Sequence, residues 1–399
     1  MTEQDKSAAL IAAVERDDPA AVAECLRSGA PADSRGSEGR TALMIATQRN
    51  NLAIARLLVQ AGADVNARDS VQLTPFICAG ANGFHEILAL ALGAGADLKS
   101  VNRFGGTALL PSSEKGYLRT VQLCVDAGIP INHANHLGWS ALLEAVILGD
   151  GGRLYTDIVD VLVAAGADAQ QRDRDGNSSL AHALALGQSR VAEFLAGRNP
   201  LEALSPALRE VRRQIRAFDY AAALRALAVA SPETEDVCDL HYYRGYTLAE
   251  LKRYDEALDA YRSALALKPQ AIEFHFYTAN CLRLMKKPEE ALREYDLAVA
   301  AKPQLAFHRY HKSNYLRELG RHEQAIAEME ILLSQQPRRY DFAFHLANSL
   351  RSLGRHGEAI EAIERAIAVD PVNPLYQNHK SQSLTLLGQQ AKAAEAVRA

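Results

Sequence analysis

Small, apolar and hydroxyl residues recur along this chain at intervals that predict pairs of short helices. In the first half, a hydroxyl residue followed by Ala or Pro and then an apolar residue recurs every 33 residues, at Thr41, Thr74, Thr107 and Ser140. The hydroxyl can cap a helix that begins at the next residue, where proline is also tolerated. The first helix of each repeat then carries small residues, and the second helix carries leucines. The two helices of a repeat can therefore pack closely. The pattern predicts stacked helix hairpins.

A glycine triplet runs in phase with these caps, as Gly-Ala-Asp at 62–64, 95–97 and 166–168 and as Gly-Ile-Pro at 128–130. Each glycine is expected to end the second helix of its repeat in a left-handed conformation. The last interval is 38 residues, so five residues are inserted, in the stretch from Gly149 to Leu154 between two helices. Pro111 lies one turn inside an expected helix, where it should weaken or kink it.

The caps and triplets resemble ankyrin repeats over about residues 7–196. The resemblance implies a domain over residues 1–197, with a capping unit at 7–34 and units that start near 39, 72, 105, 138 and 176. The pattern restarts at Ser178 for the last of these.

In the second half the period changes to 34 residues. Four columns keep this step: prolines (Pro269, Pro303, Pro337, Pro371), alanines from Ala223 to Ala393, leucines from Leu248 to Leu384, and the small residues Gly245, Ala279, Ser313, Ala347 and Ser381. A small residue facing an alanine allows two helices to approach closely, and the proline ends the second helix. Helix hairpins stacked in series are again predicted.

This spacing, with Tyr254-Asp255-Glu256-Ala257-Leu258 as one close match, resembles tetratricopeptide repeats. The resemblance implies a domain over residues 204–399, with units that start near 204, 238, 272, 306, 340 and 374 and a short linker at 198–203. The predicted fold is therefore all-α, with two consecutive α-solenoids.

In the tetratricopeptide family the first helix of each unit faces a binding groove. At the matching positions an aromatic residue, an asparagine and an arginine recur three times at spacing i, i+4, i+7, which places them on one helical face. Asparagine could bind a peptide backbone, and arginine could bind a carboxylate or a phosphate. The alternative is that these side chains are only solvated on the helix surface and recur because the repeats are copies of one unit. The predicted groove comprises Tyr242, Tyr246, Phe276, Tyr277, Asn280, Arg283, Tyr310, His311, Asn314, Arg317, Phe344, His345, Asn348 and Arg351.

The ankyrin-like half offers a second candidate surface on its loops, where Trp139 is either an interface anchor or a residue packed on a neighbouring turn. The predicted partner surface comprises Arg68, Gln72, Arg103, Phe104, His136, Trp139, Arg172 and Arg174.

The charge balance, the cysteines and the absence of catalytic motifs argue against several classes of function. The chain has 44 basic and 48 acidic residues, which gives no global field for nucleic acid or membrane. Five isolated cysteines and the lack of a long apolar run favour a reducing cytoplasm. His133 and His136 lack further zinc ligands, and we find no phosphate loop or nucleophile motif. We expect no enzyme, metal, cofactor or small-molecule substrate.

The sequence therefore predicts a non-catalytic protein-binding scaffold or adaptor. Its tetratricopeptide-like groove would bind an extended, acidic peptide, and its ankyrin-like surface would bind a second protein. The alternative is a dedicated neutraliser or chaperone, such as an immunity protein or effector holder, that clasps one partner with both arrays.

Overall fold

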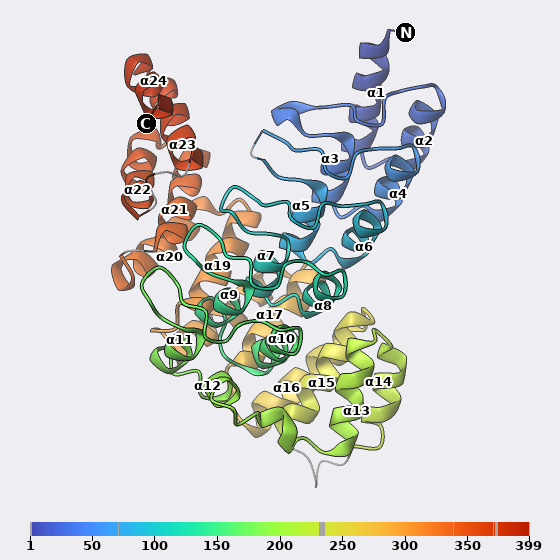
Figure 1. Ribbon diagram of the computed structural model, residues 1–399, viewed down its shortest axis with the longest axis vertical. Coiled ribbons are helices and arrows are strands. Elements are labelled where there is room, and N and C mark those ends of the chain that lie inside the picture. Colours follow the sequence, from blue (N-terminus) through green and yellow to red (C-terminus); the bar gives the residue numbers. More distant parts are fainter. Residues whose placement is uncertain are drawn as a thin grey trace. The chain divides into compact units, whose positions relative to one another are not determined.

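The computed structural model describes residues 2–70, 72–230, 236–337, 339–369, 371 and 374–398, and this part of the chain is all-helical (Figure 1). It forms two compact units. The first comprises Met1–Gly149 and Leu154–Ala183, and the second comprises Asp150–Arg153 and Leu184–Ala399. Residues 150–153, which lie in the stretch with the insertion, thus belong to the second unit, although the sequence places them among the ankyrin-like repeats.

The first unit is a stack of helix pairs. Its helices are α1 (Glu3–Glu15), α2 (Pro19–Arg27), α3 (Ala42–Gln48), α4 (Leu52–Gln60), α5 (Pro75–Asn82), α6 (His85–Gly93), α7 (Leu109–Glu114), α8 (Leu118–Asp126) and α9 (Ala141–Ile147), followed by most of α10 (Arg153–Ala164) and of α11 (Ser179–Ala185). Helices α1, α3, α5, α7 and α9 form one row, and α2, α4, α6 and α8 form a second row (Figure 1). The predicted solenoid of helix hairpins is confirmed.

Hydroxyl caps start the first helix of most repeats. The side chains of Thr41, Thr74 and Ser140 accept hydrogen bonds from backbone N–H groups three residues later, at 3.2, 3.2 and 3.5 Å. Thr107 is different, because α7 begins only at Leu109. Pro111 then lies in the first turn, where its missing N–H costs no helical hydrogen bond, so the expected kink is replaced by a late start.

Glycines end the second helices as predicted. Gly62, Gly95, Gly128 and Gly166 have φ values of +88°, +84°, +80° and +92°, a left-handed conformation that suits glycine. After Gly62, the N–H of Ala63 donates to the carbonyl of Leu58 at 3.0 Å, which satisfies one of the open carbonyls at the helix end.

The second unit continues the helix pairs with longer helices. They are α12 (Ser189–Leu195), α13 (Pro206–Arg216), α14 (Tyr220–Leu227), α15 (Val237–Glu250), α16 (Tyr254–Leu267), α17 (Glu273–Leu284), α18 (Pro288–Ala301), α19 (Ala306–Glu318), α20 (His322–Gln335), α21 (Tyr340–Ser352), α22 (His356–Val369), α23 (Pro374–Leu386) and α24 (Gln390–Arg398). Helix α12 lies N-terminal to the sequence boundary at residue 197, yet it belongs to this unit by its contacts. In the described ranges, no helix has the length and apolar character of a membrane span.

The column of small residues forms the contact between the two helices of each tetratricopeptide-like hairpin. Ala279 and Ala347 are fully buried, and Ser313 is buried with its hydroxyl donating to the carbonyl of Ala325 at 3.0 Å. At Gly245 a Cβ atom would lie 2.2 Å from the ring of Tyr261, which is itself buried. A side chain at this position would push the helices apart.

We therefore expect Gly245→Val to lower the free energy of unfolding by about 1–3 kcal/mol, because the added methyl groups overpack a closed contact. Urea unfolding followed by circular dichroism measures this. The matched control is Gly357→Val, since a Cβ atom at Gly357 meets nothing within 4 Å. Equal destabilisation by both variants would show that the loss comes from the β-branched residue rather than from the contact with Tyr261.

Candidate protein-binding site

The asparagines and arginines of the predicted groove lie on consecutive first helices of the second unit. Asn280 and Arg283 are on α17, and their counterparts are Asn314 and Arg317 on α19 and Asn348 and Arg351 on α21. All six side chains are partly exposed. We call these six residues the ladder.

The aromatic residues in register with the ladder are buried. Phe276, Tyr310 and Phe344 are 1%, 5% and 0% exposed. Each ring contacts an aromatic ring of the next first helix, as Phe276 does with Phe307 at a centroid distance of 4.7 Å. Unlike the sequence expectation, these rings therefore supply packing between repeats and offer little contact area to a ligand.

The remaining residues of the predicted groove divide in the same way. Tyr242, Tyr277 and His311 are buried, at 1%, 5% and 8% exposure. Tyr246 and His345 are partly exposed. Among the residues of the predicted groove, the partly exposed polar side chains are thus those of the ladder, Tyr246 and His345.

Arg317 is held by neutral groups. Its Nη1 donates to Oδ1 of Asn314 at 2.9 Å on the same helix and to Nδ1 of His345 at 2.7 Å on the next first helix. A guanidinium can only donate, so Nδ1 of His345 is the acceptor and Nε2 carries the hydrogen. That Nε2 lies 3.2 Å from the hydroxyl of Tyr310, to which it donates. A neutral imidazole thus fixes this arginine.

Arg351 repeats the arrangement one unit later. Its Nη1 donates to Nδ1 of His379 at 2.5 Å, and its Nη2 donates to Oε1 of Gln382 at 2.6 Å. Its Nε is buried and has no partner within the described part of the chain. Neither Arg317 nor Arg351 forms an ion pair with a described carboxylate.

Arg283, the first arginine of the ladder, differs from the other two. Its Nη2 pairs with both carboxylate oxygens of Glu318, at 2.9 and 3.2 Å, and its guanidinium lies 5.0 Å above the ring of Tyr315. Its positive charge is therefore compensated within the protein.

Burial makes the two uncompensated cations costly. It lowers the pKa of the Arg317 guanidinium, although Tyr310 and Glu318 act in the opposite direction, and it lowers the pKa of Arg351. A cation that is removed from water without an anionic partner raises the energy of the folded state. An anion that binds at these two arginines would relieve that cost.

The asparagine amides add donors beside the arginines. Oδ1 of Asn280 accepts from Arg283 at 3.3 Å and from the hydroxyl of Tyr295 at 3.4 Å, and Oδ1 of Asn314 accepts from Arg317. Since these oxygens are used, the amide N–H groups of Asn280 and Asn314 are the parts that could donate to a peptide carbonyl.

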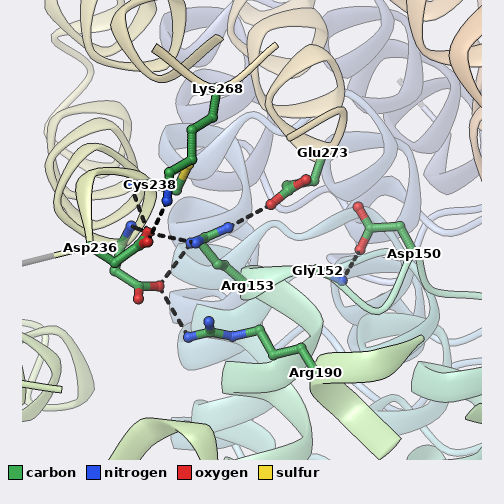
Figure 2. Close-up of polar contacts among 9 residues, drawn as sticks. Asp150, Gly152, Arg153, Arg190, Asp236, Cys238, Lys268 and Glu273 are labelled. Atoms are coloured by element: carbon green, nitrogen blue, oxygen red, sulfur yellow. Dashed lines mark hydrogen bonds and ion pairs between the residues drawn. The ribbon is translucent and has the colours of Figure 1, made fainter. Parts of the chain in front are cut away.

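A second polar cluster in this unit surrounds Arg153, which lies in the stretch with the insertion (Figure 2). Its Nε donates to Asp239 at 2.8 Å, its Nη1 to Glu273 at 2.7 Å and its Nη2 to Asp236 at 3.0 Å. The side chains of Arg153 and Asp239 are 12% and 8% exposed. Burial lowers the pKa of Arg153, but the carboxylates of Asp239 and Glu273 outweigh it and raise this pKa above its ordinary value.

Two further cations complete the Arg153 cluster. Arg190 on α12 donates to Asp239 at 3.0 Å, and Lys268 pairs with Asp236 at 2.5 Å. The charges therefore balance, with three cations against the three carboxylates. Lys268 and Arg153 hold the pKa of Asp236 down at about 2, against the opposing effect of burial. The cluster stabilises the position of residues 150–153 within the second unit.

Asp150 lies beside this cluster, and its carboxyl group is only partly hydrogen-bonded. Its Oδ1 accepts from the N–H of Gly152 at 2.8 Å, while its Oδ2 is buried without a hydrogen-bond partner in the described ranges. Burial, followed by the nearby charge of Glu273, raises the pKa of Asp150 to about 7. Figure 2 shows the hydrogen bond from Gly152 to the carboxyl of Asp150.

The Arg153 cluster could not be deduced from the repeat columns, because it joins residues 86 and 120 positions apart in sequence. The one signal in the sequence was the five-residue insertion, which breaks the 33-residue period where the cluster forms.

The candidate residues of the ankyrin-like surface have mixed roles. Nη1 of Arg68 donates to the carbonyls of Gln72 and Val101, both at 3.1 Å, and Nη1 of Arg172 donates to the carbonyl of Gly176 at 2.6 Å. These two arginines therefore stabilise the loops between repeats, even though they are exposed.

The other candidates on these loops lie as follows. The guanidinium of Arg103 stacks 5.2 Å from the ring of Phe104, and Trp139 is partly buried. Arg174 and His136 are exposed. His133, weighed above as a zinc ligand, instead has its Nε2 2.6 Å from the carbonyl of Gly105.

Repeat-family models match both halves of the chain. The ankyrin repeat model, described as three copies, matches residues 1–69 and 76–173. Tetratricopeptide repeat models match residues 238–270, 310–374 and 346–399. No curated protein matches the chain.

Two solved structures are similar to the first half. An ankyrin repeat domain from Acinetobacter baumannii is 45% identical over 47% of this chain and 96% of its own, with a TM-score of 0.46. The ankyrin repeat protein EF0377 is 38% identical over 48% of this chain and 98% of its own, with a TM-score of 0.47. The chain carries ankyrin repeats in its first half and tetratricopeptide repeats in its second half.

Proposed function

We propose that this protein is a scaffold whose ladder binds an extended, acidic segment of a partner protein. Ankyrin and tetratricopeptide repeats are protein-interaction modules, and both are typically non-catalytic. The finer proposal rests on Arg317 and Arg351, which are both partly buried and are hydrogen-bonded only to neutral groups. Carboxylates of a partner are the complementary charge.

The ladder suits a segment without regular structure of its own. Amide donors of the asparagines can bind backbone carbonyls whatever the side chains are, and the arginines then select acidic residues. The ankyrin-like half would hold a second protein through its exposed loops, with His136 and Arg174 as candidate contacts. The five cysteines are free thiols, which is consistent with the reducing cytoplasm as the proposed compartment.

The test uses the full chain and a labelled peptide of polar residues that carries several glutamates. In fluorescence anisotropy, the double variant Arg317→Ala with Arg351→Ala should bind about a hundredfold more weakly than the wild type, because two charge-assisted hydrogen bonds are lost and each is worth roughly 1.5–3 kcal/mol.

The matched control for charge is Arg321→Ala with Arg355→Ala. These arginines pair with Glu289 and Glu323 on the second helices and lie outside the ladder. An equal loss in the control would assign the binding to net charge, and full affinity in the ladder variant would overturn the proposal.

The same variants separate an adaptor from a neutraliser that clasps a single partner. With affinity capture and mass spectrometry, an adaptor should lose the partners bound at the ladder and keep those bound by its other half. A single-partner neutraliser should lose its whole set of captured proteins together.

A further inference from the structure

The three arginines of the ladder are not equivalent, and the difference constrains the ligand. Arg283 is paired with Glu318, whereas Arg317 and Arg351 contact only neutral groups. Two positively charged positions are therefore open to a ligand, and they occupy the same place in consecutive repeats.

The distance between these positions follows from how the first helices pack. Arg317 on α19 bonds to His345 on α21, and the Tyr310 ring lies 5.6 Å from the Phe342 ring, so the two first helices are in contact. Axes of packed helices lie about 8–10 Å apart. Arg317 and Arg351 are thus separated by about one such step.

An extended peptide can match this step in one particular conformation. In a polyproline II segment the side chains repeat every three residues, with a rise of about 3.1 Å per residue, so residues i and i+3 lie on one side about 9 Å apart. In a β-strand, residues three apart lie on opposite faces. Polyproline II also leaves the backbone carbonyls unpaired, so the asparagine amides can bind them.

Resting on the proposed function, we infer that the ladder selects a segment in polyproline II conformation with two acidic residues three positions apart. One carboxylate binds Arg317 and the other binds Arg351. Glu318 sets the end of this site, because it occupies Arg283 and repels a third carboxylate. Glu318 is therefore a specificity-determining residue that limits the acidic motif to two positions.

The experiment measures the binding of acetylated, amidated probe peptides to the full chain by fluorescence anisotropy. The peptides share one polar, proline-containing sequence and differ only in their glutamates: two that are three positions apart, two that are two positions apart, or three at successive intervals of three. For the wild type, we expect the first peptide to bind about tenfold more tightly than the second, and the third to gain nothing over the first.

Glu318→Gln frees Arg283 and should let the three-glutamate peptide bind about tenfold more tightly than it binds the wild type. The peptide with two glutamates three positions apart should gain less, because Glu318 lies near Arg317 but makes its ion pair with Arg283. Glu323→Gln is the matched control, because Glu323 is an exposed carboxylate that pairs with Arg355 outside the ladder. It should leave every affinity unchanged. Circular dichroism confirms that both variants are folded.

Two results would overturn the inference. If the two peptides with two glutamates bind the wild type equally, and the double variant of Arg317 and Arg351 loses both, the spacing of three positions is refuted while the proposed function stands. No gain of the three-glutamate peptide in Glu318→Gln would refute the role of Glu318. Failure of all three peptides to bind the wild type would instead refute the proposed function itself.

Discussion

Replacing Arg153 with methionine is expected to lower the free energy of unfolding of the second unit by about 3–5 kcal/mol, the typical cost of removing one partner from a buried ion cluster. Arg153 supplies three hydrogen bonds, to Asp236, Asp239 and Glu273. Without it, the carboxylates of Asp239 and Glu273, which are 8% and 16% exposed, would stay shielded from water with less compensation.

Urea unfolding measures the loss, and hydrogen exchange with mass spectrometry assigns it to α15 and α17, where the two carboxylates lie. Arg190→Met is the matched control and should cost less, because Arg190 makes one ion pair in the cluster and is more exposed, at 22%. Equal losses from the two variants would contradict the central place of Arg153.

A rescue variant separates lost charge pairing from lost packing. When Arg153→Met and Arg190→Met are combined with Asp239→Leu and Glu273→Leu, much of the stability should return, because a buried ion cluster can be replaced by apolar groups of similar volume. Arg190 is replaced as well because it would otherwise lose its partner Asp239. If this fourfold variant is less stable than Arg153→Met alone, the stranded carboxylates are not the cause of the loss.

Asp150→Asn is expected to stabilise the protein at pH 8 by on the order of 2–4 kcal/mol and to have little effect at pH 4. The pKa of Asp150 is about 7 in the folded state, against 3.8 as its ordinary value. As the pH rises from about 4 to 7, the unfolded chain loses this proton before the folded chain does. The wild type therefore loses stability across this window, and the asparagine variant does not.

The measurement is the midpoint of thermal unfolding for both proteins at several pH values. The difference should grow from pH 4 to pH 7 and then stay constant. Asp259→Asn, an exposed position on α16, is the control and should shift the midpoint little at any pH. A difference that is independent of pH, or that shrinks as the pH rises, would contradict the buried, protonated state of Asp150.

The repeat architecture could be predicted from the sequence because its determinants are local. A capping hydroxyl at Thr41, a left-handed glycine at Gly62 and a small residue at Ala279 each act within one helix pair and recur at a fixed period. Pro111 could not be interpreted correctly from the sequence, since a start of α7 one residue later than expected places this proline in the first turn of the helix.

The candidate site could be predicted only in part. Spacing places Asn314 and Arg317 on one helical face, but it does not show that Tyr310 is buried or that Glu318 pairs with Arg283. Those facts depend on side chains of the next repeat. The Arg153 cluster was beyond reach for the same reason, because its partners lie on helices that are distant in sequence.

A crystal structure of the full chain with the peptide that carries two glutamates three positions apart would show whether Arg317 and Arg351 together bind two carboxylates of an extended segment. We expect one glutamate within hydrogen-bond distance of each guanidinium, and a peptide carbonyl that accepts from the amide of Asn314. A peptide bound elsewhere, or bound with its glutamates turned away from both arginines, would refute the role of these two arginines.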